Sequence, residues 1–263
     1  MIIATKTGTI GFDEAGTGVP VVLLHGFPHD RSLWAAQLAA PPAGARLIAP
    51  DLPGFGESQR NDIPSLDAWA DGTMAFCDAL GLGKVVVGGL SMGGYLAFAI
   101  WRRHRERVSA LVLADTKAGA DTAEAKAKRI EMKTLATTEG AGAIAEKMLP
   151  GMIGKTTRDT RAHVVALLDA MMRTCSVEAM ADGLDAMRTR DDSTPMLPTI
   201  EVPTLIICGA EDVLIPVAES EAMHKAIPKS QLAVIPGAGH ASCLEHPAAF
   251  NALLSGFITA SVR

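Results

Sequence analysis

The sequence has few aromatic side chains and no excess of basic ones. Of its 263 residues, 4% are Phe, Trp or Tyr, and the formal net charge at pH 7 is -5. A protein that binds nucleic acid needs basic side chains for the phosphates, and aromatic rings for stacking on unpaired bases. We therefore expect no nucleic-acid partner and no general attraction to anionic lipid surfaces.

Cysteine is also scarce, and no long hydrophobic run is present. The four cysteines lie far apart and form no C-x-x-C pair, which argues against a zinc site or a disulfide framework. They are Cys77, Cys175, Cys208 and Cys243. No stretch of about 18 apolar residues predicts a membrane span. The first residues lack the basic start and apolar core of a secretory signal peptide. We expect a protein of the cytoplasm with no membrane partner.

What the sequence does contain is a regular alternation of short apolar runs and helical patterns. The apolar runs have the length and composition of β-strands and cover 2–4, 9–12, 19–24, 47–49, 85–87, 108–113, 204–208 and 232–235. Helical patterns between them cover 31–40, 66–80, 92–104, 217–226 and 247–259. This alternation predicts an α/β fold with a mostly parallel eight-stranded sheet and helices on both faces. The first two strands are expected to be antiparallel.

The interval 117–199 breaks this rhythm because its patterns are helical and it contains no convincing strand. We expect residues 1–116 and 200–263 to form the α/β core and 117–199 to form a helical cap inserted into it. Eight of the twelve methionines fall in this interval. Because Met adapts to irregular apolar partners, they predict a loosely packed helical core, a pliable wall over a pocket, or both.

A serine stands at the most glycine-rich corner of the chain. Residues 89–93 read Gly-Leu-Ser-Met-Gly, a G-x-S-x-G motif between the strand at 85–87 and the helix at 92–104. A sharp turn from strand into helix strains its central residue, so small neighbours are required. The turn presents the Ser91 hydroxyl above the sheet, close to the free N–H groups of the helix. The plainer alternative is a serine that only caps the helix.

A serine hydroxyl becomes a good nucleophile when a base takes its proton and an acid orients that base. In this architecture the expected chain order is Ser, then Asp or Glu, then His. His240 follows the last predicted strand, and Asp212 follows the strand before it. Both are expected at the carboxyl edge of the sheet, together with Ser91. Asp115, which ends another strand, and Glu211 are the alternative acids.

An acyl-transfer site also needs backbone N–H donors for the oxyanion of its intermediate. The N–H of Met92, directly after the serine, is the first expected donor. The loop after the third strand, residues 24–28, reads LHGFP, and the N–H of Phe27 is the second candidate. We interpret His25 in this loop as a structural hydrogen-bonding residue rather than a base. Candidates for contact with substrate are Trp34, Leu90 and His29.

Taken together, these motifs resemble those of the α/β-hydrolase superfamily. HGFP at 25–28 resembles its oxyanion loop, DLPGFGES at 51–58 its D-x-P-G-x-G-x-S segment, and GLSMGG at 89–94 its nucleophile elbow. The acid turn at 209–212 and the histidine loop at 237–240 complete the resemblance, which covers nearly the whole chain apart from the helical insertion. Relatives that open epoxides or displace halide carry aspartate at the elbow, so the serine argues against those reactions.

Among the serine members, the chain looks most like small carboxylesterases and 3-oxoadipate enol-lactonase-like enzymes. The resemblance implies a serine hydrolase that cleaves carboxylic esters of small molecules through an acyl-enzyme intermediate, with a Ser-His-Asp triad and no metal or organic cofactor. A lactonase of the 3-oxoadipate enol-lactone type and a non-catalytic ligand-binding protein with this fold are the alternatives. Three basic residues could hold the carboxylate of such a lactone or simply face solvent: Arg173, Arg188 and Arg190. A side activity of the perhydrolase kind is also open.

Overall fold

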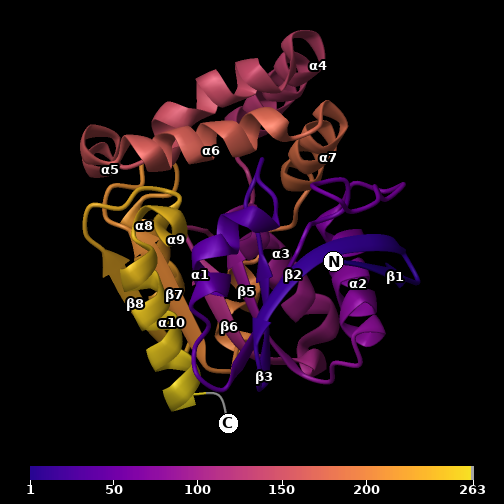
Figure 1. Cartoon of the computed structure of the whole chain (residues 1–263), viewed down its shortest axis with the longest axis vertical. Helices are drawn as coiled ribbons and strands as arrows, with labels where there is room; N and C mark the ends of the chain where they lie inside the picture. The colour runs from indigo at the N-terminus through magenta and orange to yellow at the C-terminus, as the bar shows by residue number, and fades with distance from the viewer. Residues whose placement is uncertain (262–263) are drawn as a thin grey trace.

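A twisted sheet runs through the centre of the computed structural model, which describes residues 1–261 (Figure 1). Within these residues it has eight strands in the order β1-β2-β4-β3-β5-β6-β7-β8. The pairs β1–β2 and β2–β4 are antiparallel, and every other neighbouring pair is parallel. The strands are β1 (Ile2–Thr5), β2 (Gly8–Gly16), β3 (Val19–Leu24), β4 (Ala45–Pro50), β5 (Val85–Leu90), β6 (Val108–Ala114), β7 (Thr204–Gly209) and β8 (Ser230–Ile235). The predicted sheet and its antiparallel start are confirmed.

Helices cover both faces of this sheet, which is why its central strands are apolar without interruption. All six residues of β5 and all six of β7 are buried. Val85 and Val87 pack into one hydrophobic cluster with α2 and α3, whereas Val86 packs into a second cluster with α10. The helices of the core are η1 (Arg31–Trp34), α1 (Ala35–Ala39), α2 (Leu66–Ala79), α3 (Met92–His104), η2 (Arg105–Arg107), η3 (Thr194–Thr199), α8 (Val217–Ala226), α9 (Ser242–Glu245) and α10 (Pro247–Ser261).

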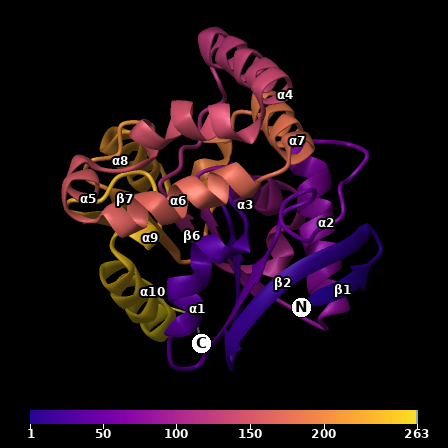
Figure 2. The same cartoon turned by 45° about the horizontal axis from the view of Figure 1, so that its top comes forward.

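Four helices between β6 and β7 form a separate layer, which we call the cap. They are α4 (Ala123–Met152), α5 (Lys155–Thr160), α6 (Ala162–Thr174) and α7 (Val177–Arg188). Helix α4 bends sharply at Gly140, where φ is 82° and ψ is -177°, so it consists of two helical pieces. Figures 1 and 2 show the cap lying across the top of the core, over the end of the sheet where the parallel strands finish.

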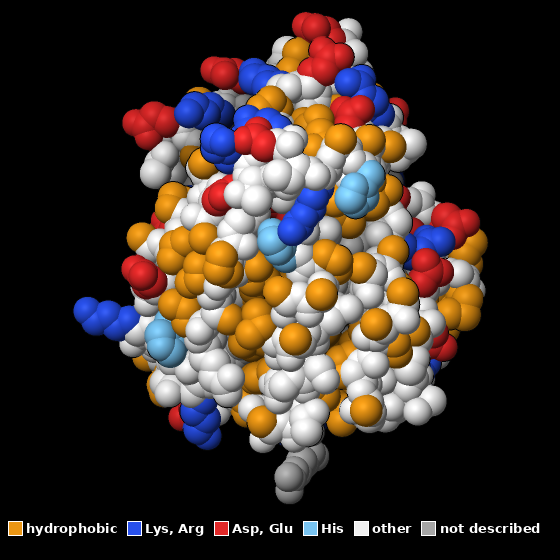
Figure 3. Space-filling model, turned by 60° about the vertical axis from the view of Figure 1, so that its left-hand side comes forward, with side chains coloured by type: hydrophobic (Ala, Val, Ile, Leu, Met, Phe, Trp, Pro, Cys, Tyr) orange, Lys and Arg blue, Asp and Glu red, His pale blue; other side chains and the backbone are white. Residues whose placement is uncertain are grey.

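The surface of the cap differs from that of the core below it. In the space-filling view, acidic and basic side chains gather over the cap, while the lower part of the same face shows mainly hydrophobic and uncharged side chains (Figure 3). Among residues 1–261, no helix combines the length and the apolar character that crossing a membrane requires.

Candidate active site

Ser91 lies at the turn from β5 into α3 with a backbone conformation that non-glycine residues rarely adopt. Its φ is 54° and its ψ is -110°, a strained geometry that costs on the order of 1–3 kcal/mol. A Cβ atom on Gly89 would come within 2.1 Å of the Gly93 carbonyl oxygen, and one on Gly93 within 2.1 Å of the Leu24 carbonyl oxygen. The glycines of the motif are therefore required for this turn, and the turn leaves the Ser91 side chain partly accessible.

The structure brings Ser91, His240 and Asp212 into one chain of hydrogen bonds. The distance from Ser91 Oγ to His240 Nε2 is 2.8 Å, and that from His240 Nδ1 to Asp212 Oδ2 is 2.7 Å. The other carboxylate oxygen of Asp212 accepts hydrogen bonds from the N–H groups of Leu214 and Ile215, which fixes its orientation. With the proton on Nδ1, the imidazole donates to Asp212 and leaves Nε2 free to accept the serine proton.

The environment of His240 balances two opposing effects. The imidazole is 3% exposed, and burial by itself favours the neutral ring. The carboxylates of Asp212, Asp115 and Glu245 together outweigh this desolvation, so the pKa of His240 lies above its ordinary value. The arrangement suits a base whose protonated form is stabilised by Asp212 once it has taken a proton.

The two alternative acids have other partners. Asp115 follows β6 with a φ of 45° and accepts hydrogen bonds from the Gly209 N–H at 2.9 Å and the Ser242 hydroxyl at 2.5 Å. Its burial raises the pKa of Asp115 to about 8. Glu211 accepts from the N–H and hydroxyl groups of Thr156 in the cap. Within residues 1–261, Asp212 alone forms a carboxylate hydrogen bond with the imidazole of His240.

The backbone N–H groups of Phe27 and Met92 are among those near Ser91 that have no acceptor within residues 1–261. Met92 is the first residue of α3, so its N–H has no partner within the helix and lies at the positive end of the helix dipole. Phe27 lies in the loop after β3, and hydrogen bonds with residues 51–58 hold this loop in place. These two N–H groups are unpaired donors of the kind that an oxyanion site requires.

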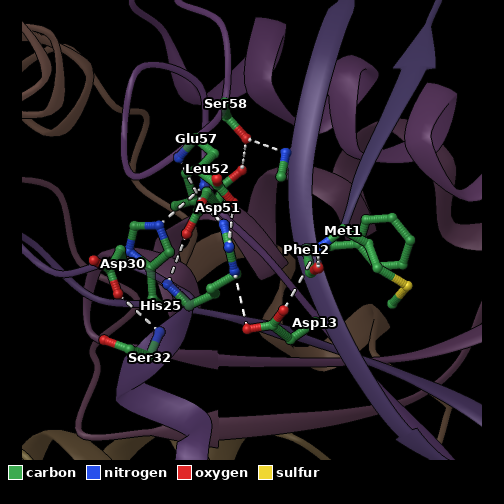
Figure 4. Close-up of polar contacts among 12 residues, drawn as sticks. Met1, Phe12, Asp13, His25, Asp30, Ser32, Asp51, Leu52, Glu57 and Ser58 are labelled. Atoms are coloured by element: carbon green, nitrogen blue, oxygen red, sulfur yellow. Dashed lines mark hydrogen bonds and ion pairs between the residues drawn. The ribbon is translucent and has the colours of Figure 1, made fainter.

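A polar network holds the loop after β3 in place (Figure 4). The N–H of Leu52 donates to His25 Nε2 at 2.9 Å, and His25 Nδ1 lies 2.9 Å from the Gly26 carbonyl oxygen. Burial lowers the pKa of His25, so its ring stays neutral and can accept this hydrogen bond. Asp51 accepts from the N–H groups of Arg31 and Glu57 and forms an ion pair with the Arg31 guanidinium. His25 is thus a structural residue, as predicted.

Ser91 and His240 open into a cavity of about 360 Å³ between the core and the cap. Most of its wall is apolar and flexible, and it includes four methionines. The apolar lining residues are Phe27, Ala125, Met132, Met148, Met152, Leu184, Met187, Leu214 and Ile215. Met172 and Met180 are fully buried and do not line it, so the methionines of the cap serve as both core and pocket wall.

Comparison with known proteins agrees with this geometry. The model of the alpha/beta hydrolase family matches residues 21–253. The chain belongs to this family. A malate-bound structure of a thermophilic esterase from Thermogutta terrifontis is 40% identical, with a TM-score of 0.95 over 98% of this chain and 97% of that one. The enol-lactonase of Burkholderia xenovorans LB400 is 26% identical, with a TM-score of 0.90 over 98% of this chain and all of that one.

A curated relative of this hydrolase is the pimeloyl-[acyl-carrier protein] methyl ester esterase of Aromatoleum aromaticum. It is 29% identical over 238 residues, which cover 86% of this chain and 93% of the relative. The sequence-based identification of the family and its fold is therefore confirmed. The relatives that are esterases support the prediction that this enzyme is a carboxylic-ester hydrolase.

Three residues predicted to contact substrate lie outside the cavity of the hydrolase. Leu90 is fully buried because it ends β5 with its side chain in the core cluster shared with α10. Trp34 is 1% exposed and packs against Phe250, with their ring centroids 5.8 Å apart. His29 is buried with neither ring nitrogen hydrogen-bonded within residues 1–261, and burial lowers its pKa to about 3. The prediction that these residues line the pocket is corrected.

The polar residues that do line the cavity were not found from the sequence: Tyr95, Lys117, Asp121, Lys128 and Arg129. For two of them, the position in the sequence could have indicated that they lie near the site. Tyr95 lies four residues after Ser91, one turn further along α3, and Lys117 follows shortly after the end of β6, where open α/β sheets place their ligands. Arg129 lies in the cap, whose packing no sequence pattern reveals.

The three arginines considered as carboxylate partners are all engaged with acidic residues. Arg173 pairs with Asp169 and Glu146 on the cap surface, and Arg188 pairs with Asp185. Arg190 is buried, pairs with Asp121 at 2.7 Å, and lies over the ring of Tyr95.

Proposed function

We propose that this hydrolase cleaves carboxylic esters of small molecules through an acyl-enzyme intermediate on Ser91. The observation that carries the proposal is the chain of hydrogen bonds from Ser91 through His240 to Asp212 at the mouth of a cavity. Among residues 1–261, no other serine that lines a cavity is hydrogen-bonded to a histidine that is itself hydrogen-bonded to an aspartate. The esterases among the relatives support the same reaction class.

In the proposed reaction, the Ser91 oxygen attacks the ester carbonyl while His240 Nε2 takes its proton. The oxyanion is held by the N–H groups of Phe27 and Met92, and each such donor contributes about 2.7–4 kcal/mol of transition-state stabilisation. His240 then protonates the leaving alkoxide, and a water molecule repeats the sequence to release the acid. Asp212 keeps the imidazole in the required tautomer and stabilises its protonated form.

A lactone is an internal ester, so the same groups would open one by the same steps. The enol-lactonase among the structural relatives supports lactones as a second substrate class. A ligand-binding protein without turnover would use the same cavity but would not need the strained serine and its hydrogen-bonded base.

The test compares steady-state hydrolysis of 4-nitrophenyl acetate and butyrate by the wild type and by Ser91→Ala. Removal of the nucleophile should lower kcat by a factor of about 10⁴ or more, because base and acid cannot act without it. A Ser255→Ala variant, altered on the far helix α10, is the matched control and should retain full activity. Equal turnover by wild type and Ser91→Ala would reject the proposed nucleophile, and single turnover by the wild type would favour the binding protein.

A further inference from the structure

One end of the cavity beside Ser91 is basic, although the chain as a whole is acidic. Lys117, Lys128 and Arg129 line this end, and Asp121 is the one acidic residue among the lining residues. The formal net charge of the chain is -5, so this excess of positive charge is local. A basic end in a small, partly enclosed cavity raises the local concentration of anions and favours their binding.

The acidic residue at this end does not neutralise the basic ones. Asp121 is buried and forms ion pairs with both Arg129 and Arg190, so one carboxylate faces two guanidinium groups. Within residues 1–261, neither Lys117 nor Lys128 forms an ion pair with a carboxylate within 4.0 Å. On α4, Glu124 lies four residues before Lys128 and accepts a hydrogen bond from Thr122, and Glu131 lies three residues after it.

A buried donor at the same place also lacks a partner. Arg190 has 4% side-chain exposure, and its Nε atom makes no hydrogen bond within residues 1–261. Its guanidinium lies 4.1 Å from the centroid of the Tyr95 ring. Arg190 lines a second cavity of about 180 Å³, which shares the lining residues Tyr95 and Lys117 with the first. An unsatisfied donor, Arg190 Nε, and an unpaired cation, Lys117, thus lie where the two cavities share lining residues.

Tyr95 provides a neutral donor between these cations and the nucleophile. Its side chain lines the cavity, and its hydroxyl group forms no hydrogen bond with any residue of 1–261. Burial raises the pKa of Tyr95, so the hydroxyl keeps its proton and can donate it in a hydrogen bond. The remaining lining residues are largely apolar and include four methionines, three of them on α4 as well. The cavity therefore favours a molecule with an apolar chain and one anionic end.

We infer that the hydrolase prefers anionic substrates, namely esters or lactones whose acyl part ends in a free carboxylate, and that Lys117, Lys128 and Arg129 bind this carboxylate with the Tyr95 hydroxyl. The inference rests on the proposed function, because it names the substrate class of the same site. A carboxylate suits the site because it accepts hydrogen bonds from several donors at once and is small enough to share the cavity with the reacting ester.

The experiment compares two series of methyl esters with equal acyl length. One series is the monomethyl esters of the dicarboxylic acids from succinic to suberic, and the other is the methyl esters from butanoate to octanoate. Initial rates are followed by proton release in a pH-stat. The double variant Lys117→Met with Lys128→Met tests the basic end. The matched control is Lys126→Met with Lys147→Met, which removes the same charge from exposed positions of α4 outside the cavity.

For at least one acyl length, the wild type should show a kcat/KM for the half-ester about tenfold or more above that for the neutral ester. This factor corresponds to one charge-assisted hydrogen bond. The Lys117 and Lys128 variant should lose most of this ratio, whereas the control should keep it. Raising the salt from about 0.05 M to about 0.5 M should also reduce the ratio in the wild type. This measurement does not depend on the folding of any variant.

Two results overturn the inference. One is that neutral esters are cleaved as fast as half-esters at every acyl length, and the other is that the two double variants change the ratio equally. Both leave the proposed function intact, because ester hydrolysis that depends on Ser91 is still observed. Absence of turnover for both series and for 4-nitrophenyl esters is a different result and rejects the proposed function itself.

Discussion

The core and the cap of this hydrolase differ in how tightly their side chains are held. In the core, every residue of β5 and β7 is buried, and the strand ends carry Ser91 and the turn of Asp212. In the cap, only four of the thirty residues of α4 are buried, although this helix supplies much of the cavity wall. A rigid scaffold can fix reacting atoms to within fractions of an ångström, and a looser layer can adapt to different substrates.

This difference suggests a division of labour between the two layers. Substitutions in the core should change kcat for every ester, whereas those in the cap should change which ester is preferred. Three pairs of variants can test or refine this division.

The first pair compares two aspartates at neighbouring strand ends of the core. Asp212→Asn should lower kcat by about 10³–10⁴-fold, because an amide cannot stabilise the imidazolium and favours the wrong tautomer of His240. Asp115→Asn should cost much less, since Asp115 contacts Gly209 and Ser242 rather than the imidazole. The measurement is kcat for 4-nitrophenyl butyrate with the unfolding midpoint as a check on folding. A larger loss from Asp115→Asn would overturn the choice of acid.

The second pair concerns the boundary between core and cap. Glu245 is buried, and its carboxylate accepts hydrogen bonds from the N–H groups of Gly239 at 2.8 Å and Ala241 at 3.2 Å, which flank His240. Its other oxygen accepts from the N–H of Gly154, directly before α5, at 2.9 Å. Glu245 therefore positions the histidine loop relative to the cap.

In Glu245→Gln an amide NH₂ replaces one carboxylate oxygen, so either the Gly154 N–H or both the Gly239 and Ala241 N–H groups lose their acceptor. A buried donor without an acceptor costs about 1–3 kcal/mol, so kcat should fall by about 10- to 100-fold with a smaller change in KM. Glu211→Gln is the control, because the Glu211 side chain binds Thr156 of the same cap segment, and the contact of Glu211 with the histidine loop is a backbone N–H donated to the Ala238 carbonyl, which the substitution leaves in place. Equal losses in both variants would mean that the cap contact matters and the position of His240 does not.

The third pair compares two methionines within the cap. Met148 lines the cavity, so Met148→Ala should enlarge it and shift the preferred acyl chain towards longer esters by a few-fold in kcat/KM. Met180 is fully buried away from the cavity, so Met180→Ala should lower the free energy of unfolding by about 2–5 kcal/mol and leave the chain-length profile unchanged. A profile that shifts with Met180→Ala alone would argue against the cap as a selective wall.

The sequence could predict the core much better than the cavity. Strands such as 85–87 and 204–208 are apolar throughout because they are buried on both faces, and glycines around Ser91 mark a turn that few other residues allow. The order of Ser91, Asp212 and His240 along the chain then limits which residues can meet at the edge of the sheet.

The cavity could not be predicted in the same way. Leu90 stands next to Ser91 in the sequence, but its side chain points into the core. Arg129 lies far from Ser91 along the chain and reaches the cavity only through the packing of α4. Helix periodicity predicts that α4 exists, but it does not specify which of its faces meets the core.

The central claim is that the Ser91 oxygen becomes covalently bonded to the substrate, and mass spectrometry of the labelled protein tests it most directly. The enzyme is incubated with a fluorophosphonate, which traps activated serine nucleophiles, and the adduct is located in peptides. We predict one adduct per chain, on Ser91, and no adduct in Ser91→Ala or after mutation of His240 to alanine. An adduct on another residue, or a fully active enzyme that never becomes labelled, would contradict the account.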